Sequence, residues 1–234
     1  MKVFFLSGLG ADRSVFQFLD LSFCEPVFID WIDPQQSESL SDYALRLKEQ
    51  HLPDDAIVVG LSFGGMLATE IAKKYPSIKA ILISSSKTKQ ELPPVYSIGK
   101  YFPFHRWSPY AVQKWFMLQI KSLFGIQTKK TEKIYEIIIE NSNPEFNIWA
   151  INAILEWENI QVPENIIHIH GTRDRILPYK YVQCNYAIEK GGHLMIMEQA
   201  ELLSGILKNL ITNKLVNLSV LSSSTNQPVR LYRE

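Results

Sequence analysis

The sequence predicts an α/β fold: a mostly parallel sheet that is covered by helices on both faces and carries a helical cap insertion. Short apolar runs alternate with amphipathic stretches of helical length, which is the pattern of strands joined by crossover helices. The apolar runs are continuous rather than alternating, as expected for strands that are buried on both faces. Of the 234 residues, 46% are hydrophobic and 12% aromatic, which is enough for the core of one domain.

Individual elements follow from these patterns. The expected strands are 2–6, 26–29, 56–61, 78–84, 165–169 and part of 183–188. The expected helices of the core are 39–50, 64–75 and 194–211, each amphipathic at helical spacing. The core is therefore assigned to residues 1–86 and 161–234. About the last twenty residues, which include the polar run 222–226, are expected to form a loose tail or an added edge strand.

The regular alternation stops at residues 87–160, the predicted cap or lid insertion. Prolines interrupt this segment, and its expected helices are 109–124, 131–141 and 145–158. Residues 95–116 contain eight aromatic residues in 22 positions, well above the 12% of the whole chain. Such a segment either packs a small core of its own or covers a pocket at the carboxyl edge of the sheet.

Charge and hydropathy exclude several classes of partner. Lys and Arg number 24 and Asp and Glu number 24, so the chain lacks the positive field that nucleic-acid binding needs. The first apolar run ends at Ser7, too early for a signal peptide, and no run approaches the roughly 20 apolar residues of a membrane span. The two cysteines form no metal-binding or disulfide pattern. We expect a cytoplasmic monomer or homodimer that acts on a small molecule, with no nucleic-acid or membrane partner.

The strongest local signal is the motif Gly60-Leu61-Ser62-Phe63-Gly64, which leaves an apolar strand and enters an amphipathic helix. A sharp turn from strand to helix presents a serine hydroxyl on a strained backbone, and only small residues two positions away on either side avoid a collision. The alternative is a tight glycine turn in which the serine is incidental. The position between strand and helix favours a functional serine.

A serine hydroxyl becomes a good nucleophile only when a base removes its proton and a third group orients that base. After Ser62 the only aspartate is Asp174, and after Asp174 the only histidine is His193. Each follows a predicted strand, so the three residues lie at the edge where open α/β sheets place their sites. Taken alone, Asp174 could cap a helix and His193 could begin one. Their order together favours catalysis.

The chain resembles the α/β-hydrolase superfamily, in its serine-nucleophile, esterase-like branch. The resemblance covers nearly the whole chain and is carried by the Gly60 to Gly64 motif, the His-Gly-x-x-Asp loop that ends at Asp174, and the Gly-His pair at His193. It implies Ser62 as nucleophile, His193 as base and Asp174 as acid. It also implies an oxyanion hole formed by the backbone N–H groups of Phe63 and Leu9.

The resulting hypothesis is a serine hydrolase that cleaves a carboxylic ester or thioester with an apolar moiety through an acyl-enzyme. No cofactor or metal is expected, because the nucleotide-binding and zinc motifs are missing and His168 and His170 are interpreted as core histidines. One alternative is a cofactor-free lyase or C–C hydrolase on the same triad, another a non-catalytic ligand-binding member. The lyase would use a further polar group in the pocket, for which the candidates are Lys100, His105, Arg106 and Lys114.

Overall fold

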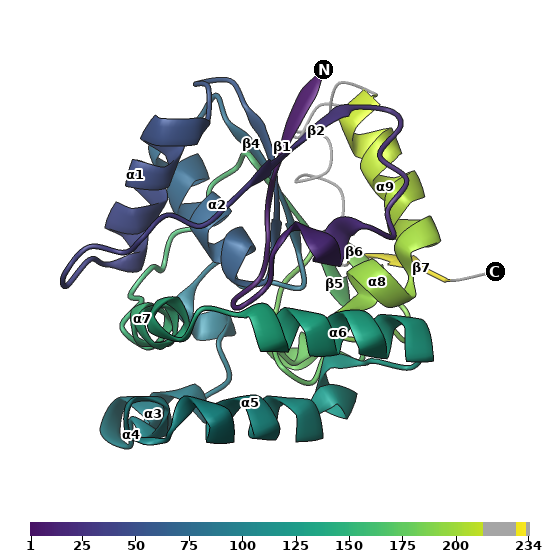
Figure 1. Cartoon of the computed structure of the whole chain (residues 1–234). Helices are drawn as coiled ribbons and strands as arrows, with labels where there is room; N and C mark the ends of the chain where they lie inside the picture. Colours follow the sequence, from purple (N-terminus) through teal and green to yellow (C-terminus); the bar gives the residue numbers. More distant parts are fainter. Residues whose placement is uncertain (213–227, 233–234) are drawn as a thin grey trace.

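The computed structural model describes residues 1–212 and 228–232, and its centre is a twisted parallel sheet (Figure 1). The strands are β1 (Lys2–Leu6), β2 (Glu25–Ile29), β3 (Ile57–Leu61), β4 (Lys79–Ile83), β5 (Ile166–Gly171), β6 (Tyr186–Ile188) and β7 (Val229–Leu231). Their order is β2-β1-β3-β4-β5-β6-β7, and every neighbouring pair is parallel. All carboxyl ends therefore point to one edge, and the predicted fold class is confirmed.

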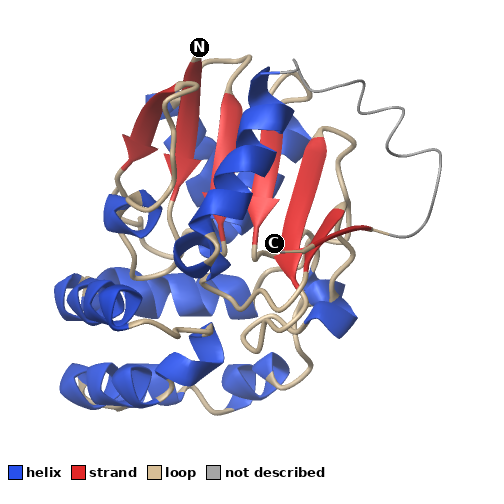
Figure 2. Ribbon diagram, turned by 90° about the vertical axis from the view of Figure 1, so that its right-hand side faces the viewer, coloured by secondary structure: helices blue, strands red, loops and turns tan. Residues whose placement is uncertain are grey.

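Helices cover both faces of this sheet, as Figure 2 shows from the side. They are α1 (Leu40–His51), α2 (Phe63–Lys74), α8 (Met195–Glu198) and α9 (Ala200–Thr212), with short 3-10 turns η1 (Arg13–Phe16) and η4 (Tyr179–Tyr181). Helix α1 begins where predicted because Ser39 accepts a hydrogen bond from the backbone of Asp42 and so satisfies a free N–H of the first turn. The single helix predicted at 194–211 is instead two helices, interrupted at Gln199.

The two faces of the sheet support two separate apolar cores. Successive side chains of a strand point to opposite faces. Phe5, Val59 and Ile81 accordingly pack in one cluster with α9, whereas Leu6 and Val58 pack in the other with α1 and α2. Because both faces are buried, most strand positions in the centre of the sheet are apolar, which explains the continuous runs in the sequence.

The chain between β4 and β5 forms two tiers of helices across the carboxyl edge of the sheet (Figure 1). The elements are η2 (Lys89–Glu91), α3 (Tyr96–Tyr101), α4 (Phe104–Trp107), α5 (Tyr110–Gln119), η3 (Lys121–Phe124), α6 (Lys129–Asn141) and α7 (Pro144–Leu155). Helices α6 and α7 form the inner tier against the sheet, and α3, α4 and α5 form the outer tier. The helix expected at 109–124 ends at Gln119 and is followed by the turn η3. The assignment of 87–160 as a cap stays a prediction.

The expected tail is described only in part. Residues 222–226 lie outside the described residues. Beyond them, Val229–Leu231 pairs in parallel with β6 as the edge strand of the sheet.

The buried face of α2 provides a test of this core. Leu67 is completely buried between α2 and the sheet, and Leu67→Ala should lower the free energy of unfolding by about 2–5 kcal/mol because it leaves a cavity. Val112 is 43% exposed, and Val112→Ala should change stability by less than about 0.5 kcal/mol. Urea unfolding of both variants measures the difference, and equal losses would contradict the assigned packing.

Candidate active site

Ser62 occupies a strained turn between β3 and α2. Its backbone dihedral angles are φ 50° and ψ −115°, a conformation that residues with a side chain rarely adopt. The turn is fixed from the neighbouring strand β4: the N–H of Ser62 donates to the carbonyl of Ile83 (2.9 Å), and the carbonyl of Ser62 accepts from the Ser85 hydroxyl (2.7 Å). The structure therefore holds the Ser62 side chain at the carboxyl edge of the sheet.

The two glycines of the motif are required by close backbone contacts. A Cβ atom on Gly64 would lie 2.3 Å from the carbonyl oxygen of Ser7, and one on Gly60 would lie 2.5 Å from the carbonyl oxygen of Gly64. The N–H of Gly64 also donates to the carbonyl of Ser7 (3.0 Å). The helix thus begins in direct contact with the end of β1, which any larger side chain would prevent.

Ser62, His193 and Asp174 come together in one hydrogen-bonded line. The Ser62 hydroxyl lies 3.0 Å from Nε2 of His193, and Nδ1 of His193 donates to Oδ2 of Asp174 across 2.8 Å. Asp174 is in the loop after β5 and His193 in the loop after β6, so adjacent parallel strands deliver both residues to the same edge. Both side chains are almost completely buried.

The environment of Asp174 favours its charged form. Burial by itself raises the pKa of this carboxyl group, but the neighbouring His193 and His170 and the N–H of Leu177 outweigh burial and lower its pKa below the ordinary value. Its other oxygen, Oδ1, accepts from the N–H groups of Ile176 (2.9 Å) and Leu177 (2.8 Å). The carboxylate is thereby fixed in orientation with one oxygen directed at His193.

The loop after β1 lies beside Ser62. A Cβ atom on Gly8 would lie 3.5 Å from Cβ of Ser62. The Ser7 hydroxyl donates to the carbonyl of Ala11 (2.7 Å), which closes the loop on itself. Among the described residues, the backbone N–H groups of Leu9 and Phe63 have no acceptor within the protein. Both predicted oxyanion residues line the cavity that contains Ser62.

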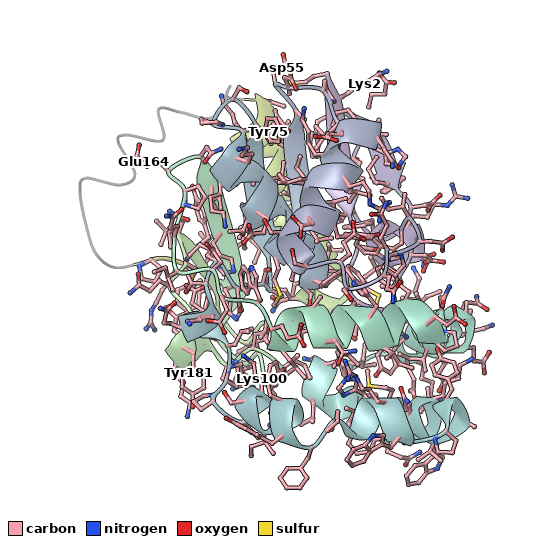
Figure 3. The ribbon with its side chains drawn as sticks, turned by 90° about the vertical axis from the view of Figure 1, so that its left-hand side faces the viewer. Lys2, Asp55, Tyr75, Lys100, Glu164 and Tyr181 are labelled. Carbon is pink, nitrogen blue, oxygen red and sulfur yellow. The ribbon has the colours of Figure 1, made fainter. Side chains whose placement is uncertain are left out.

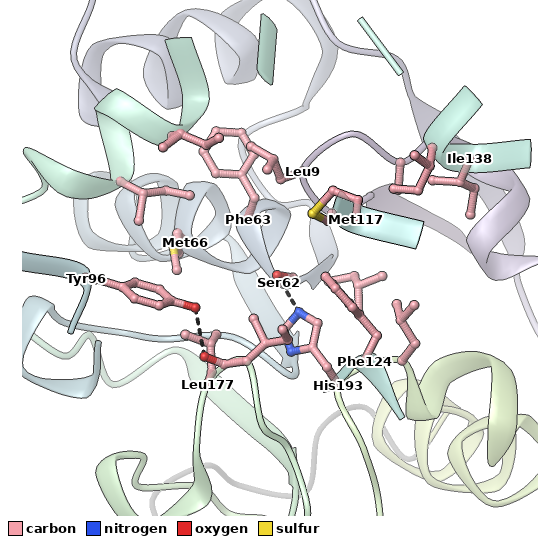
Figure 4. A pocket seen from close by; sticks show the side chains of 18 of the residues that line it. Leu9, Ser62, Phe63, Met66, Tyr96, Met117, Phe124, Ile138, Leu177 and His193 are labelled. Carbon is pink, nitrogen blue, oxygen red and sulfur yellow. Dashed lines mark hydrogen bonds between the residues drawn. The ribbon is translucent and has the colours of Figure 1, made fainter. Parts of the chain in front are cut away.

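Ser62 and His193 face an apolar cavity of about 400 Å³, to whose walls both helical tiers contribute (Figure 4). Met66 and Tyr96 lie to one side of Ser62, and Met117 and Ile138 lie to the other. The remaining walls are Gly8, Leu9, Ala11, Val15, Leu61, Phe63, Val95, Gly99, His105, Phe124, Tyr135, Ile139, Ile151, Ile154, Leu155, Ile176, Leu177 and Leu194. The cavity thus extends in two directions from the serine.

Few polar groups reach the cavity. Tyr96 donates its hydroxyl to the carbonyl of Ile176 (2.8 Å), and burial raises the pKa of Tyr96 to about 12, so the phenol stays neutral. Of the four polar candidates of the sequence analysis, only His105 lines the wall, and its Nε2 lies 2.8 Å from Oδ1 of Asn152. Lys100, Arg106 and Lys114 instead interact with Glu158, Asn152 and the carbonyl of Glu140.

Comparison with known proteins identifies the family of this chain. The sequence profile described as the Alpha/beta hydrolase family matches residues 3–205, most of the chain. The chain belongs to the alpha/beta hydrolase family. The resemblance inferred from the sequence motifs is therefore confirmed. No curated protein matches this alpha/beta hydrolase in sequence.

Solved structures share the fold of this alpha/beta hydrolase at low sequence identity. A thermophilic esterase from Thermogutta terrifontis is 18% identical with a TM-score of 0.70, over 92% of this chain and 91% of the esterase. An esterase from Exiguobacterium antarcticum is 12% identical with a TM-score of 0.70, over 91% and 92%. A meta-cleavage product hydrolase from Pseudomonas fluorescens is 15% identical with a TM-score of 0.65, over 92% and 91%. These similarities establish the fold.

A buried polar chain lies behind Asp174 in this alpha/beta hydrolase. Nε2 of His170 lies 3.5 Å from Oδ2 of Asp174, the same oxygen that accepts from His193. Nδ1 of His170 lies 3.3 Å from Nε2 of His168, and Nδ1 of His168 lies 3.5 Å from Nζ of Lys87. Both histidines are completely buried. Sequence patterns placed them in the core and missed this link to Asp174, because alternation along a strand shows which face a residue occupies but not what it touches.

The hydrogen bonds determine the proton positions along this chain. His170 donates from Nε2 to the carbonyl of Leu177 (2.8 Å), so its Nδ1 is the acceptor and Nε2 of His168 the donor. Nδ1 of His168 then accepts from the Lys87 ammonium group. Burial lowers the pKa of both His168 and His170, which keeps both rings neutral. Lys87 is itself paired with the buried Glu91 at 3.1 Å.

The lowered pKa of Asp174 predicts a pH-dependent contribution to stability. A carboxyl group whose folded-state pKa lies below its unfolded value stabilises the fold above the unfolded pKa, and this stabilisation is lost as the pH falls through the folded value. The stability difference between wild type and Asp174→Asn should therefore shrink below about pH 4. Asp55 is exposed, and Asp55→Asn is the control. Urea unfolding from pH 7 to 3 measures both, and a difference that grows with acidification would contradict the assignment.

Proposed function

We propose that this alpha/beta hydrolase is a serine hydrolase that cleaves a carboxylic ester or thioester with apolar substituents through an acyl-enzyme. One observation carries the proposal: the line from Ser62 through His193 to Asp174, with spacings of 3.0 and 2.8 Å, opens at Ser62 into an apolar cavity. A nucleophile and its base within hydrogen-bonding reach, with the base oriented by a carboxylate, are the requirements for activating a serine hydroxyl.

In the first half of the reaction, Oγ of Ser62 attacks the substrate carbonyl carbon while Nε2 of His193 takes the hydroxyl proton. The negative charge that develops on the carbonyl oxygen is stabilised by the backbone N–H groups of Phe63 and Leu9. Asp174 fixes the tautomer of His193 and stabilises the imidazolium ion. The bond to the alcohol or thiol then breaks, and His193 returns its proton to the leaving oxygen or sulfur.

In the second half, a water molecule replaces the leaving group. His193 takes a proton from this water, whose oxygen attacks the carbonyl carbon of the ester formed with Ser62. The bond to Oγ of Ser62 breaks, and His193 gives the proton back to the serine. The carboxylic acid product leaves, and the protein is restored without any cofactor.

The walls of the cavity support an uncharged, apolar substrate. Among the described residues that line it, none is Lys, Arg, Asp or Glu. The volume of about 400 Å³ lies at the small end of ligand sites. Because it extends to both sides of Ser62, we propose that one branch takes the acyl group and the other the alcohol or thiol group. The helices over this cavity, residues 87–160, would serve as its cap.

Replacement of the serine tests the proposal directly. Ser62→Ala should reduce kcat on a p-nitrophenyl ester by about 10⁴-fold or more, because no nucleophile remains. A fluorophosphonate should label wild type at Ser62 and should not label this variant. Ser97 lies on the outer tier away from the line, and Ser97→Ala should keep full activity. Undiminished turnover in Ser62→Ala would exclude the mechanism, and turnover of β-diketones or cyanohydrins but not esters would favour the lyase alternative.

The contact between His170 and Asp174 gives a second test. His170→Phe removes the imidazole that lies 3.5 Å from Asp174 and its hydrogen bond to the carbonyl of Leu177. It should lower kcat about tenfold at constant KM, because only the position of the acid and its loop changes. His170→Gln retains a donor at the end of its side chain and should recover part of the lost activity. His51 is exposed, and His51→Gln serves as the control. Equal activity of the Phe and Gln variants would show that His170 only fills space.

A further inference from the structure

The outer tier of helices presents apolar side chains to solvent. Tyr101 is 79% exposed, Trp107 72% and Phe102 69%, and Trp115 is 62% exposed. Figure 3 shows aromatic rings that project from this tier on the side away from the sheet. We call this surface the outer apolar face, and its residues are Ile98, Tyr101, Phe102, Trp107, Trp115 and Phe116.

The spacing of these residues places the exposed apolar side chains on one side of each helix. Ile98 and Tyr101 are three residues apart on α3, and Phe102 follows directly after its end. Val112, Trp115 and Phe116 are three and four residues apart on α5. Residues at such spacings share one side of a helix. The other side of the same helices lines the cavity, through residues such as Tyr96 and Met117. The outer tier is therefore apolar on both sides, although only one side is covered by protein.

The charge of this part of the chain has one sign. Residues 92–131 contain no Asp or Glu, although the whole chain is neutral. Their basic residues are Lys100, Arg106, Lys114, Lys121, Lys129 and Lys130. Lys100 and Lys121 pair with acidic residues of other segments, and both side chains keep 41% of their surface exposed. Lys129 and Lys130 begin the inner-tier helix α6, whereas Lys100, Arg106 and Lys114 belong to the outer tier. The segment that forms the outer apolar face therefore contains basic residues and no acidic ones.

We propose that the outer apolar face docks on the surface of an anionic lipid bilayer. Exposed Trp, Tyr and Phe side chains bordered by Lys and Arg are the combination that an interface of acyl chains and negatively charged headgroups attracts. A second copy of the chain fits less well, because pairing this face with itself would bring like charges together. Within residues 1–212 and 228–232, no helix combines the length and the hydropathy of a membrane span. The contact that we propose is a peripheral one.

This docking extends the proposed function, since the lipid-facing helices are also the wall of the cavity that contains Ser62. An apolar ester dissolved in the bilayer would then lie next to helices whose other side lines the cavity that contains Ser62. The expectation that the protein has no membrane partner rested on the lack of a spanning run, which does not bear on peripheral contact.

Sedimentation with lipid vesicles tests the docking. Wild type should bind vesicles of phosphatidylcholine and phosphatidylglycerol at least about tenfold more tightly than vesicles of phosphatidylcholine alone, and added salt should weaken this binding. The double variant Trp107→Ser, Trp115→Ser should bind the anionic vesicles at least about tenfold less tightly, because two exposed indoles no longer enter the interface. Both substitutions lie at exposed positions, and circular dichroism should confirm that the fold is retained.

Matched variants distinguish docking through the outer apolar face from non-specific hydrophobic binding to vesicles. Ile160 is 63% exposed and Tyr232 is 65% exposed, both outside the outer tier, and Ile160→Ser and Tyr232→Ser should bind as wild type does. Ser62→Ala should also bind normally, so docking is measured independently of catalysis. The proposal is overturned by no binding to anionic vesicles, by equal binding of the double variant, or by a solution dimer that the double variant dissociates.

Discussion

The strained turn at Ser62 is the constraint on which the rest of the site depends. Its unfavourable dihedral angles persist because the neighbouring strands hold both ends: β4 through Ile83 and Ser85, and β1 through the contact between Ser7 and Gly64. A turn with these angles would relax in a short peptide. The parallel sheet is thus the device that fixes the serine, since it supplies rigid partners on either side of the turn.

The same sheet brings the partners of Ser62 to it. Adjacent strands β5 and β6 end beside each other, so the loops that contain Asp174 and His193 start from a common edge. Asp174 is fixed on one side by backbone N–H groups and on the other by His193 and His170. Behind it, the chain from His170 to Lys87 uses each ring nitrogen once. Buried polar groups are costly when unpaired, so this complete pairing fixes one arrangement of protons and rotamers.

The helices between β4 and β5 have two apolar sides with different partners. Their inner side contributes walls to the cavity at Ser62, whereas Trp107, Trp115 and other rings of the outer side face solvent. The contact between these helices and the site is direct: the N–H of Leu194, next to His193, donates to the carbonyl of Phe124 (2.9 Å). A change in the position of these helices would therefore displace His193, the general base of the proposed reaction.

The sequence by itself determined the features that depend on local pattern. Continuous apolar runs specified buried parallel strands, and the glycines around Ser62 specified a sharp turn. Asp174 is the only aspartate after Ser62 and His193 the only histidine after Asp174, which left one choice of partners unless a glutamate replaced the acid. The tertiary structure decided what residues distant in sequence do to one another. It placed His170 3.5 Å from Asp174 and paired Arg106 with Asn152 in a hydrogen bond. It also left one side of the outer tier exposed. Local pattern specifies which face a side chain occupies, but packing of separate segments specifies its neighbours.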